Sequence, residues 1–282
     1  IIENDYEEYI AMKRIESSSN KKSPHQSLRS LFLHDIHIDH IAEKLVVCQA
    51  DEWTANALHI MDTHDFDCLG VEENGKVIGY IEKHDLGDGI CRDDMKSFIT
   101  TEVVSDSTSL LKTLYLFKET KRIFVLEENR ISKLVTHADL QKAPVQLFLF
   151  GLVSLTEMYL LQWIKKYLPY EEWKPYLNNS RLREAYRLFN ERKKVNEEIQ
   201  LIDCLQLCDK RDIVLSVKDM YTILPFPSKN KMRDYFRRIE SLRNDLAHAQ
   251  DFIVKFTKEE IIDLVLQTEK VLRILEEELL GG

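Results

Sequence analysis

The sequence has little of what marks fibrous, disulfide-rich or membrane proteins. Its 282 residues include 8 glycines, 6 prolines and 5 cysteines. So little glycine and proline excludes collagen-like and low-complexity chains. The cysteines are odd in number and form no Cys-x-x-Cys pair, so we expect reduced thiols and a cytoplasmic location. The longest apolar run, Val145–Leu155, is shorter than the about 18 residues of a membrane helix, and no signal-peptide pattern opens the chain.

Positive charge is scarce in the first half of the chain. Residues 1–145 contain 17 Lys and Arg against 26 Asp and Glu, whereas residues 146–282 contain 22 of each. A net charge of −9 disfavours general nucleic-acid binding, which depends on neutralising phosphates. The stretch Lys229–Arg243 is the local exception, because it contains six basic residues and only two acidic ones, Asp234 and Glu240.

The region between residues 31 and 142 alternates short strands and helices and contains an internal duplication. Val71 aligns with Val125 and Asp85 with Asp139 at an offset of 54, and Asp51 aligns with Asp106 at 55. Asn74-Gly75 is a hairpin-turn signal in the first copy. The expected elements are Leu45–Cys48, Thr54–Met61, Cys68–Val71, Val77–Ile81, Ser107–Phe117, Ile123–Leu126 and Ile131–Thr136.

After Pro144 the helical period replaces the strand pattern. Pro225-Phe226-Pro227 ends one segment, Ser228 is expected to cap the next, and Thr257 with Glu260 forms a capping box. The expected helices are Val145–Leu168, Ser180–Lys194, Glu197–Cys208, Ser228 to about Ala249, and Lys258–Leu280. The fold class is therefore α+β: an α/β pair of repeats followed by an all-α bundle. The expected division is a tail and linker over 1–30, repeats at about 38–90 and 97–142 within 31–143, and a helical domain over 144–282.

The duplicated unit resembles a CBS domain, so residues 31–143 resemble a CBS pair, or Bateman module. Val71–Leu86 reads VEENGKVIGYIEKHDL and Ile131–Leu140 reads ISKLVTHADL, each ending in Asp-Leu. The resemblance implies an adenine nucleotide, AMP or ATP, in clefts between the repeats as a regulatory ligand. It assigns Thr136, Asp139 and Asp85 to this ligand, with the carboxylates accepting hydrogen bonds from ribose hydroxyls.

The first copy departs from that pattern, because Glu82 replaces the threonine and would repel a phosphate. We therefore expect one competent nucleotide site, built on Thr136 and Asp139. A structural interpretation stays open, since Thr and Asp are also good helix N-caps.

The second half resembles a HEPN domain. Arg243-Asn244-Asp245-Leu246-Ala247-His248 matches the Arg-x4-His signature of HEPN ribonucleases, with a polar residue after the arginine and one long helix still to follow. The resemblance implies RNA cleavage without metal or catalytic cofactor. It also implies a homodimer, through the helical domain and also the repeats, and a link to stress or phage defence.

The chemistry suits these residue types. Histidine is the side chain that ordinarily changes charge near neutral pH, so His248 can act as a base or acid, while Arg243 offers a planar cation to a phosphate. Asn244 would orient the phosphate or the histidine. The phosphate-tracking residues would be Lys231, Arg233, Arg237 and Arg238.

Two other interpretations remain open. The chain could be a non-catalytic nucleotide-sensing dimer that binds RNA or protein, or the repeats could be a ligand-free dimerisation platform. The histidines His34, His37 and His40 are three residues apart, as a metal site on a helix would need. They also fit the segment that leads into a first CBS repeat, and we expect no metal there.

Overall fold

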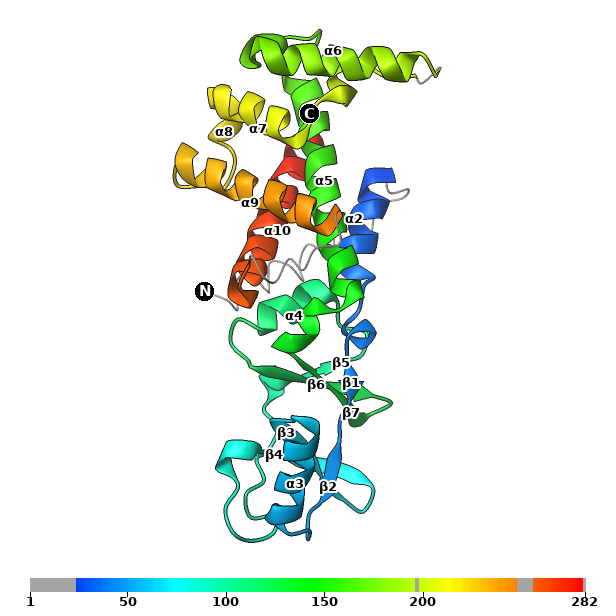
Figure 1. The fold of residues 1–282 in the computed structure, drawn as a ribbon, viewed down its shortest axis with the longest axis vertical. Helices are drawn as coiled ribbons and strands as arrows, with labels where there is room; N and C mark the ends of the chain where they lie inside the picture. The colour runs from blue at the N-terminus through cyan, green and yellow to red at the C-terminus, as the bar shows by residue number, and fades with distance from the viewer. Residues whose placement is uncertain (1–23, 196–197, 248–255, 281–282) are drawn as a thin grey trace.

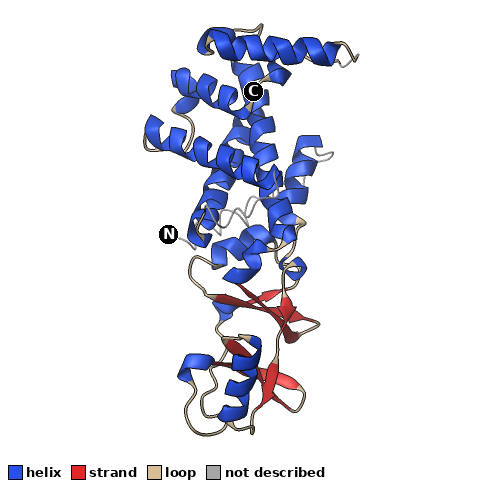
Figure 2. Ribbon diagram, viewed as in Figure 1, coloured by secondary structure: helices blue, strands red, loops and turns tan. Residues whose placement is uncertain are grey.

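A computed structural model of the chain describes residues 24–195, 198–247 and 256–280. The molecule is elongated, with two small sheets at one end and a helical bundle at the other (Figures 1 and 2). Helix α5 (Ala143–Tyr167) runs from the second sheet into the middle of the bundle.

The two repeats share one β-α-β-β topology, which confirms the duplication. In each repeat the first strand is parallel to the second, and the second is antiparallel to the third. The first repeat consists of β2 (Val47–Gln49), α3 (Thr54–His64), β3 (Cys68–Glu73) and β4 (Lys76–Glu82), and the second of β5 (Val103–Ser105), α4 (Leu110–Leu116), β6 (Arg122–Glu127) and β7 (Arg130–Thr136). Both hairpins even carry a register shift at the same place, after Val71 and after Val125.

Both hairpin turns have two residues in the left-handed region. Asn74 and Gly75 have φ of 51° and 75°, and Glu128 and Asn129 have φ of 47° and 64°. Two positive φ angles define the type I′ turn that matches the twist of antiparallel strands. The Asn-Gly signal is thus confirmed, and the second turn forms without a glycine.

The β-like run expected over Leu45–Cys48 is confirmed only in part, because β2 begins at Val47 and the chain crosses between the sheets just before it. Strand β1 (Glu43–Lys44) pairs with β7 of the second repeat, and β2 starts the first repeat at Val47, after two intervening residues. Leu45 lies between them, buried against Cys68, Tyr80 and Phe124 in a small core between the repeats. The segment that enters the first repeat therefore completes the sheet of the other.

The bundle forms largely where its sequence signals predict. Ser228 Oγ accepts from Lys231 N at 3.2 Å, and Thr257 and Glu260 exchange bonds of 2.8 and 3.1 Å. Besides α5, the helices are α2 (Pro24–His34), α6 (Asn179–Lys193), α7 (Leu207–Ser216), α8 (Lys218–Tyr221), α9 (Lys229–Ala247) and α10 (Lys258–Leu280). Short 3₁₀ segments are η1 (Ile38–His40), η2 (Lys83–Asp85), η3 (Thr100–Glu102), η4 (His137–Gln141), η5 (Lys174–Tyr176) and η6 (Leu201–Cys204).

Two expected segments need correction. The helix expected over Glu197–Cys208 is replaced by η6 and the start of α7, because Asp203 and Asp209 each accept a backbone N–H three residues earlier and begin separate helices. Residues 24–30, expected as linker, belong to α2. That helix packs against α5, where the ring of Phe32 fills the space beside Gly151.

The main core joins the second repeat to the bundle. Buried side chains of α4 and β6 belong to one continuous cluster with those of α5, α7, α9 and α10. The first repeat has its own core of eight buried residues. Helix α5 is long and apolar enough to cross a membrane, which the run-length count did not detect, but 61% of its apolar window is buried inside the protein.

Candidate functional site

Asp139 and Thr136, the expected nucleotide ligands of the second repeat, form the capping box of η4. Asp139 Oδ2 accepts from Thr136 N at 2.7 Å and from Thr136 Oγ1 at 3.2 Å. The Asp139 side chain is only 9% exposed. The capping interpretation of this pair is therefore present in the structure, while its role as a nucleotide ligand stays a prediction.

Lys142 contacts the second carboxylate oxygen of Asp139, the one that Thr136 leaves available. Its Nζ lies 2.7 Å from Asp139 Oδ1 and 2.8 Å from Glu43, and it donates to Ile41 O at 2.6 Å. Burial lowers the pKa of Lys142, but the hydrogen bonds to Asp139 and Glu43 outweigh it and the net shift is upward. Lys142 is also the N-cap residue of α5. This lysine, which sequence reasoning missed, ties the segment before the first repeat to the start of α5.

The equivalent position in the first repeat is filled by a charge network. Asp85, the other expected nucleotide ligand, is ion-paired with Lys96, and Lys96 also lies 2.6 Å from Glu82. Arg122, from β6 of the second repeat, is paired with Glu82, and both side chains are almost fully buried. The expected repulsion by Glu82 is therefore compensated by two cations, one of them supplied by the other repeat.

These contacts determine the ionisation of Glu82 and Asp85. Burial raises the pKa of Glu82, but the hydrogen bonds from Lys96 and Arg122 outweigh it and the pKa falls below its ordinary value. The hydrogen bond from Lys96 likewise lowers the pKa of Asp85. Both groups are therefore carboxylates at neutral pH.

Glu82, His84 and Asp85 are the group in the described residues whose ligand atoms lie near enough to hold a metal ion. Lys96 already occupies the space between the two carboxylates, so no separate cation is needed there. The histidines His34, His37 and His40 do not share one helix, because α2 ends at His34. The rings of His37 and His40 stack at 6.2 Å instead.

The expected catalytic motif lies at the end of α9, and the structure describes it in part. Arg243 is half-buried, and its Nε lies 3.7 Å from Glu157 Oε2 of α5. Glu157 also accepts from Lys210 of α7 at 2.7 Å, and the Lys210 side chain is only 5% exposed. Asn244 is exposed, and His248 lies outside the described residues. Arg243 is thus part of a three-helix charge cluster that the sequence did not reveal.

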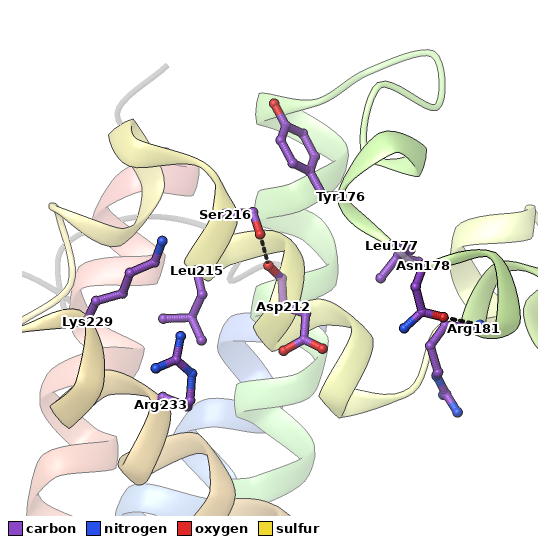
Figure 3. A pocket seen from close by; sticks show the side chains of 9 residues that line it. All are labelled: Tyr176, Leu177, Asn178, Arg181, Asp212, Leu215, Ser216, Lys229 and Arg233. Atoms are coloured by element: carbon purple, nitrogen blue, oxygen red, sulfur yellow. Dashed lines mark hydrogen bonds between the residues drawn. The ribbon is translucent and has the colours of Figure 1, made fainter.

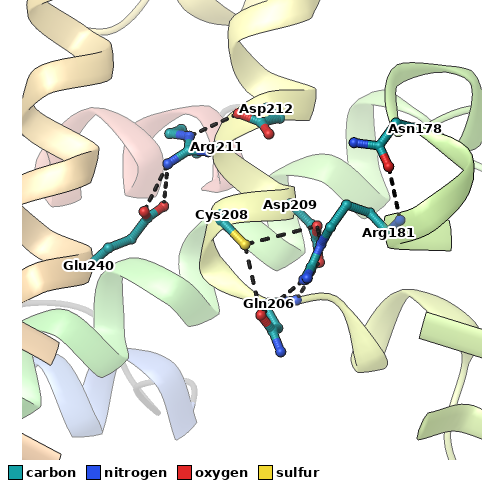
Figure 4. Close-up of polar contacts among 8 residues, drawn as sticks. All are labelled: Asn178, Arg181, Gln206, Cys208, Asp209, Arg211, Asp212 and Glu240. Carbon is teal, nitrogen blue, oxygen red and sulfur yellow. Dashed lines mark hydrogen bonds and ion pairs between the residues drawn. The ribbon is translucent and has the colours of Figure 1, made fainter. Parts of the chain in front are cut away.

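The four expected RNA-binding residues lie on two sides of α9. Consecutive residues turn by about 100° around a helix, so Arg233 and Arg237 share a side with Asn244, whereas Lys231 and Arg238 lie roughly 100° or more away. Arg238 donates to Glu260 O at 3.0 Å, at the start of α10. Arg211 of α7 binds both oxygens of Glu240 at 2.8 Å (Figure 4). By the same helical spacing, Glu240 lies on the side of α9 that carries Arg233 and Arg237.

A cleft with a volume of about 300 Å³ opens at the beginning of α9 (Figure 3). Lys229 and Arg233 line it from α9, Asp212 and Ser216 from α7, and Tyr176 from the connection before α6. Sequence reasoning singled out Arg233 only, since a cleft between three distant segments leaves no local signal.

Solved structures similar to the N-terminal part of the chain are CBS-domain proteins. CBSX2 from Arabidopsis thaliana is 18% identical, and the match covers 40% of this chain and 96% of that one with a TM-score of 0.35. CBSX2 in complex with AMP is 17% identical, and the match covers 40% of this chain and 98% of that one with a TM-score of 0.35. A putative acetoin utilization protein from Vibrio cholerae is 16% identical, and the match covers 40% of this chain and 92% of that one with a TM-score of 0.36.

No protein-family profile matches the chain, and neither does any curated protein sequence. At these identities and TM-scores the structural likenesses establish no shared function. The protein itself contains a tandem pair of β-α-β-β repeats, and the second repeat shares its core with a helical bundle.

Proposed function

We propose that the protein is a nucleotide-regulated, metal-independent endoribonuclease, with a sensing pair of repeats and a catalytic helical bundle. The observation that carries this proposal is the path along α5. Lys142, which pairs with Asp139, occupies the N-cap position of α5, and Glu157 on the same helix contacts Arg243. A helix rises 1.5 Å per residue, so these two positions lie about 22 Å apart on one rigid element.

The nucleotide acts by competing for Asp139. A ribose with two vicinal hydroxyls can donate two hydrogen bonds to a carboxylate, as Lys142 and Thr136 do now. Binding therefore displaces Lys142 from Asp139 and loosens its hold on Glu43 and Ile41 at the head of α5. The similar CBSX2 structure contains AMP, which makes AMP the first ligand to test.

The bundle performs the cleavage. His248 removes the proton from an RNA 2′-hydroxyl, the 2′-oxygen forms a bond to phosphorus, and the bond from phosphorus to the 5′-oxygen breaks. That oxygen takes up a proton, which leaves a 2′,3′-cyclic phosphate and a 5′-hydroxyl. Arg243 neutralises the phosphate, for which it must leave Glu157, and Asn244 orients it. One such pair is a small active site, so a second copy of the chain completes it as a homodimer.

Regulation follows if the nucleotide binds two arrangements of α5 with different affinity. In the arrangement described here, Glu157 holds Arg243 and Lys142 holds Asp139. A ligand that releases Lys142 from Asp139 favours the other arrangement of α5, in which Arg243 has left Glu157 and can bind a phosphate.

A second candidate is a dimeric RNA- or protein-binding module without catalysis. The Arg243–Glu157–Lys210 cluster favours it, because these charges also stabilise the packing of α5, α7 and α9 without any reaction. In that case His248 has no role in chemistry.

Cleavage of labelled RNA in EDTA separates the two candidates. We expect cleavage by the wild type, none by His248→Ala, and unchanged cleavage by the control His84→Ala, whose side chain is 71% exposed in the first repeat. AMP and ATP are added in parallel, and Asp139→Ala should remove any effect of the nucleotide. No cleavage under any condition would support the binding module, whereas cleavage that survives in His248→Ala would exclude the Arg243/His248 site as its source.

A further inference from the structure

The cleft at the start of α9 contains two cations, Lys229 and Arg233, that form no ion pair within the described residues. Lys229 and Arg233 lie one helical turn apart and both line the cleft. Among the described residues neither forms an ion pair; Arg233 donates to Asn230 Oδ1 at 2.9 Å, and Lys229 Nζ lies 4.9 Å above the ring of Tyr221. Figure 3 shows both side chains extending from α9 toward the cleft.

The other charged residues of the lining are already paired. Arg181 holds Asp209 through two bonds of 2.7 and 2.9 Å, and its guanidinium points away from the cleft (Figures 3 and 4). Asp212 binds Arg211 at 2.8 Å. Arg211 also binds Glu240, so Asp212 offsets part of the positive charge in the cleft. Lys229 and Arg233 together outweigh it and leave the lining with a net positive charge, although the whole chain has a net charge of −9.

Exposed aromatic rings accompany these cations. Tyr176 lines the cleft and is 39% exposed, and Lys174 of the same 3₁₀ segment donates to the hydroxyl of Tyr186, which is 41% exposed. Asn178 accepts from Arg181 N at 3.0 Å through Oδ1, so its amide nitrogen remains able to donate. Cations beside exposed rings are the combination that single-stranded nucleic acid needs, one for phosphates and the other for stacked bases.

We propose that this cleft binds a segment of single-stranded RNA, with Lys229 and Arg233 on its phosphates and a base stacked on Tyr176. This site rests on the proposed function and gives it a substrate class. Arg237 and Asn244 continue the same side of α9, and Arg243 lies ten residues beyond Arg233, about 15 Å along the helix. A strand held in the cleft therefore extends along α9 toward the motif at its end.

The test is RNA binding, measured separately from cleavage. Binding of a fluorescently labelled single-stranded RNA is followed by anisotropy in EDTA, in the His248→Ala background so that the probe stays intact. Three variants are compared with this parent: Lys229→Ala with Arg233→Ala, Tyr176→Ala, and a charge-matched control, Lys44→Ala with Lys76→Ala. The control lysines are exposed on the repeats, at the other end of the molecule.

We expect the double variant of the cleft to bind RNA at least tenfold more weakly than the control. Loss of two phosphate contacts should also reduce the slope of log K against log salt by about 1.4. Tyr176→Ala should weaken binding by about fivefold or more without changing that slope, because stacking carries no charge.

Equal affinities of the cleft variant and the control would overturn the proposal, and so would the absence of RNA binding by the parent. Complete displacement of the RNA by AMP would also overturn it, because the cleft would then belong to a free nucleotide. If the wild type cleaves no RNA but the cleft variants still lose binding, the ribonuclease proposal fails and the RNA site stands.

Discussion

The two repeats have one topology but different surroundings. The helix of the second repeat, α4, packs on α10, and its buried residues belong to the main core. The first repeat packs its eight buried residues among themselves and contacts the second through Leu45, Tyr80 and Phe124. The two copies therefore differ in their packing: the second repeat shares the main core with the bundle, whereas the first repeat has a separate core.

This difference also separates the two positions at which the sequence predicts a nucleotide ligand. Asp139 and Lys142 lie at the head of α5, so a change there reaches the bundle directly. Asp85 and Glu82 lie at the contact between the repeats, where Arg122 joins them. The proposed function therefore predicts that a ligand at Asp85 shifts one repeat against the other, whereas a ligand at Asp139 acts on α5.

Core truncations should show the largest contrast. Leu114→Ala and Leu69→Ala each remove a fully buried side chain, from α4 and from β3, and each should cost about 2–5 kcal/mol. Hydrogen exchange should rise across the second repeat, α5 and α10 in Leu114→Ala, but only within the first repeat in Leu69→Ala. Global acceleration of exchange in both variants would show that the repeats unfold as one unit.

Breaking the ion pair between Glu82 and Arg122, which joins the two repeats, should have the second largest effect on stability. Glu82→Gln leaves the almost buried guanidinium of Arg122 without its carboxylate, which should cost about 1–3 kcal/mol in urea unfolding at neutral pH. Asp62→Asn is the control, since the Asp62–Lys83 pair is solvent-exposed and should contribute little.

The effect of Glu82 should depend on pH with a defined sign. Its pKa is lowered in the folded protein, so its stabilisation is fully present above the ordinary glutamate value of about 4.3 and is lost as the pH falls through the folded pKa. The stability gap between wild type and Glu82→Gln should therefore narrow below about pH 4. A gap that widens on acidification would contradict the ion-pair explanation.

The smallest expected effect compares the two aspartates. Asp139→Ala removes the capping box of η4 and the partner of Lys142, which should cost about 0.5–2 kcal/mol. Asp85→Ala should change stability little, because the Asp85 side chain is 39% exposed and Lys96 retains its ion pair with Glu82. Equal losses in thermal unfolding would mean that the repeats support the fold equally at these positions.

Local features of the fold followed from the sequence alone. The offset of 54 predicted two units of one topology, Asn74-Gly75 predicted a hairpin turn, and Ser228 and Thr257 predicted helix starts. These signals work because a turn or a cap is decided by a few neighbouring residues. The sequence also placed Arg243 near the end of a helix, while the catalytic role of the Arg-x4-His motif remains a prediction.

Only the tertiary structure decided which distant segments meet. The crossing of β1 to the sheet of the other repeat, the pairing of Arg122 with Glu82, and the contact of Glu157 with Arg243 join residues tens of positions apart. The helical state of 24–30 was likewise decided by packing on α5, against its polar composition. Such contacts depend on which apolar faces are buried together and which charges are then left to be paired, and no local pattern records that balance.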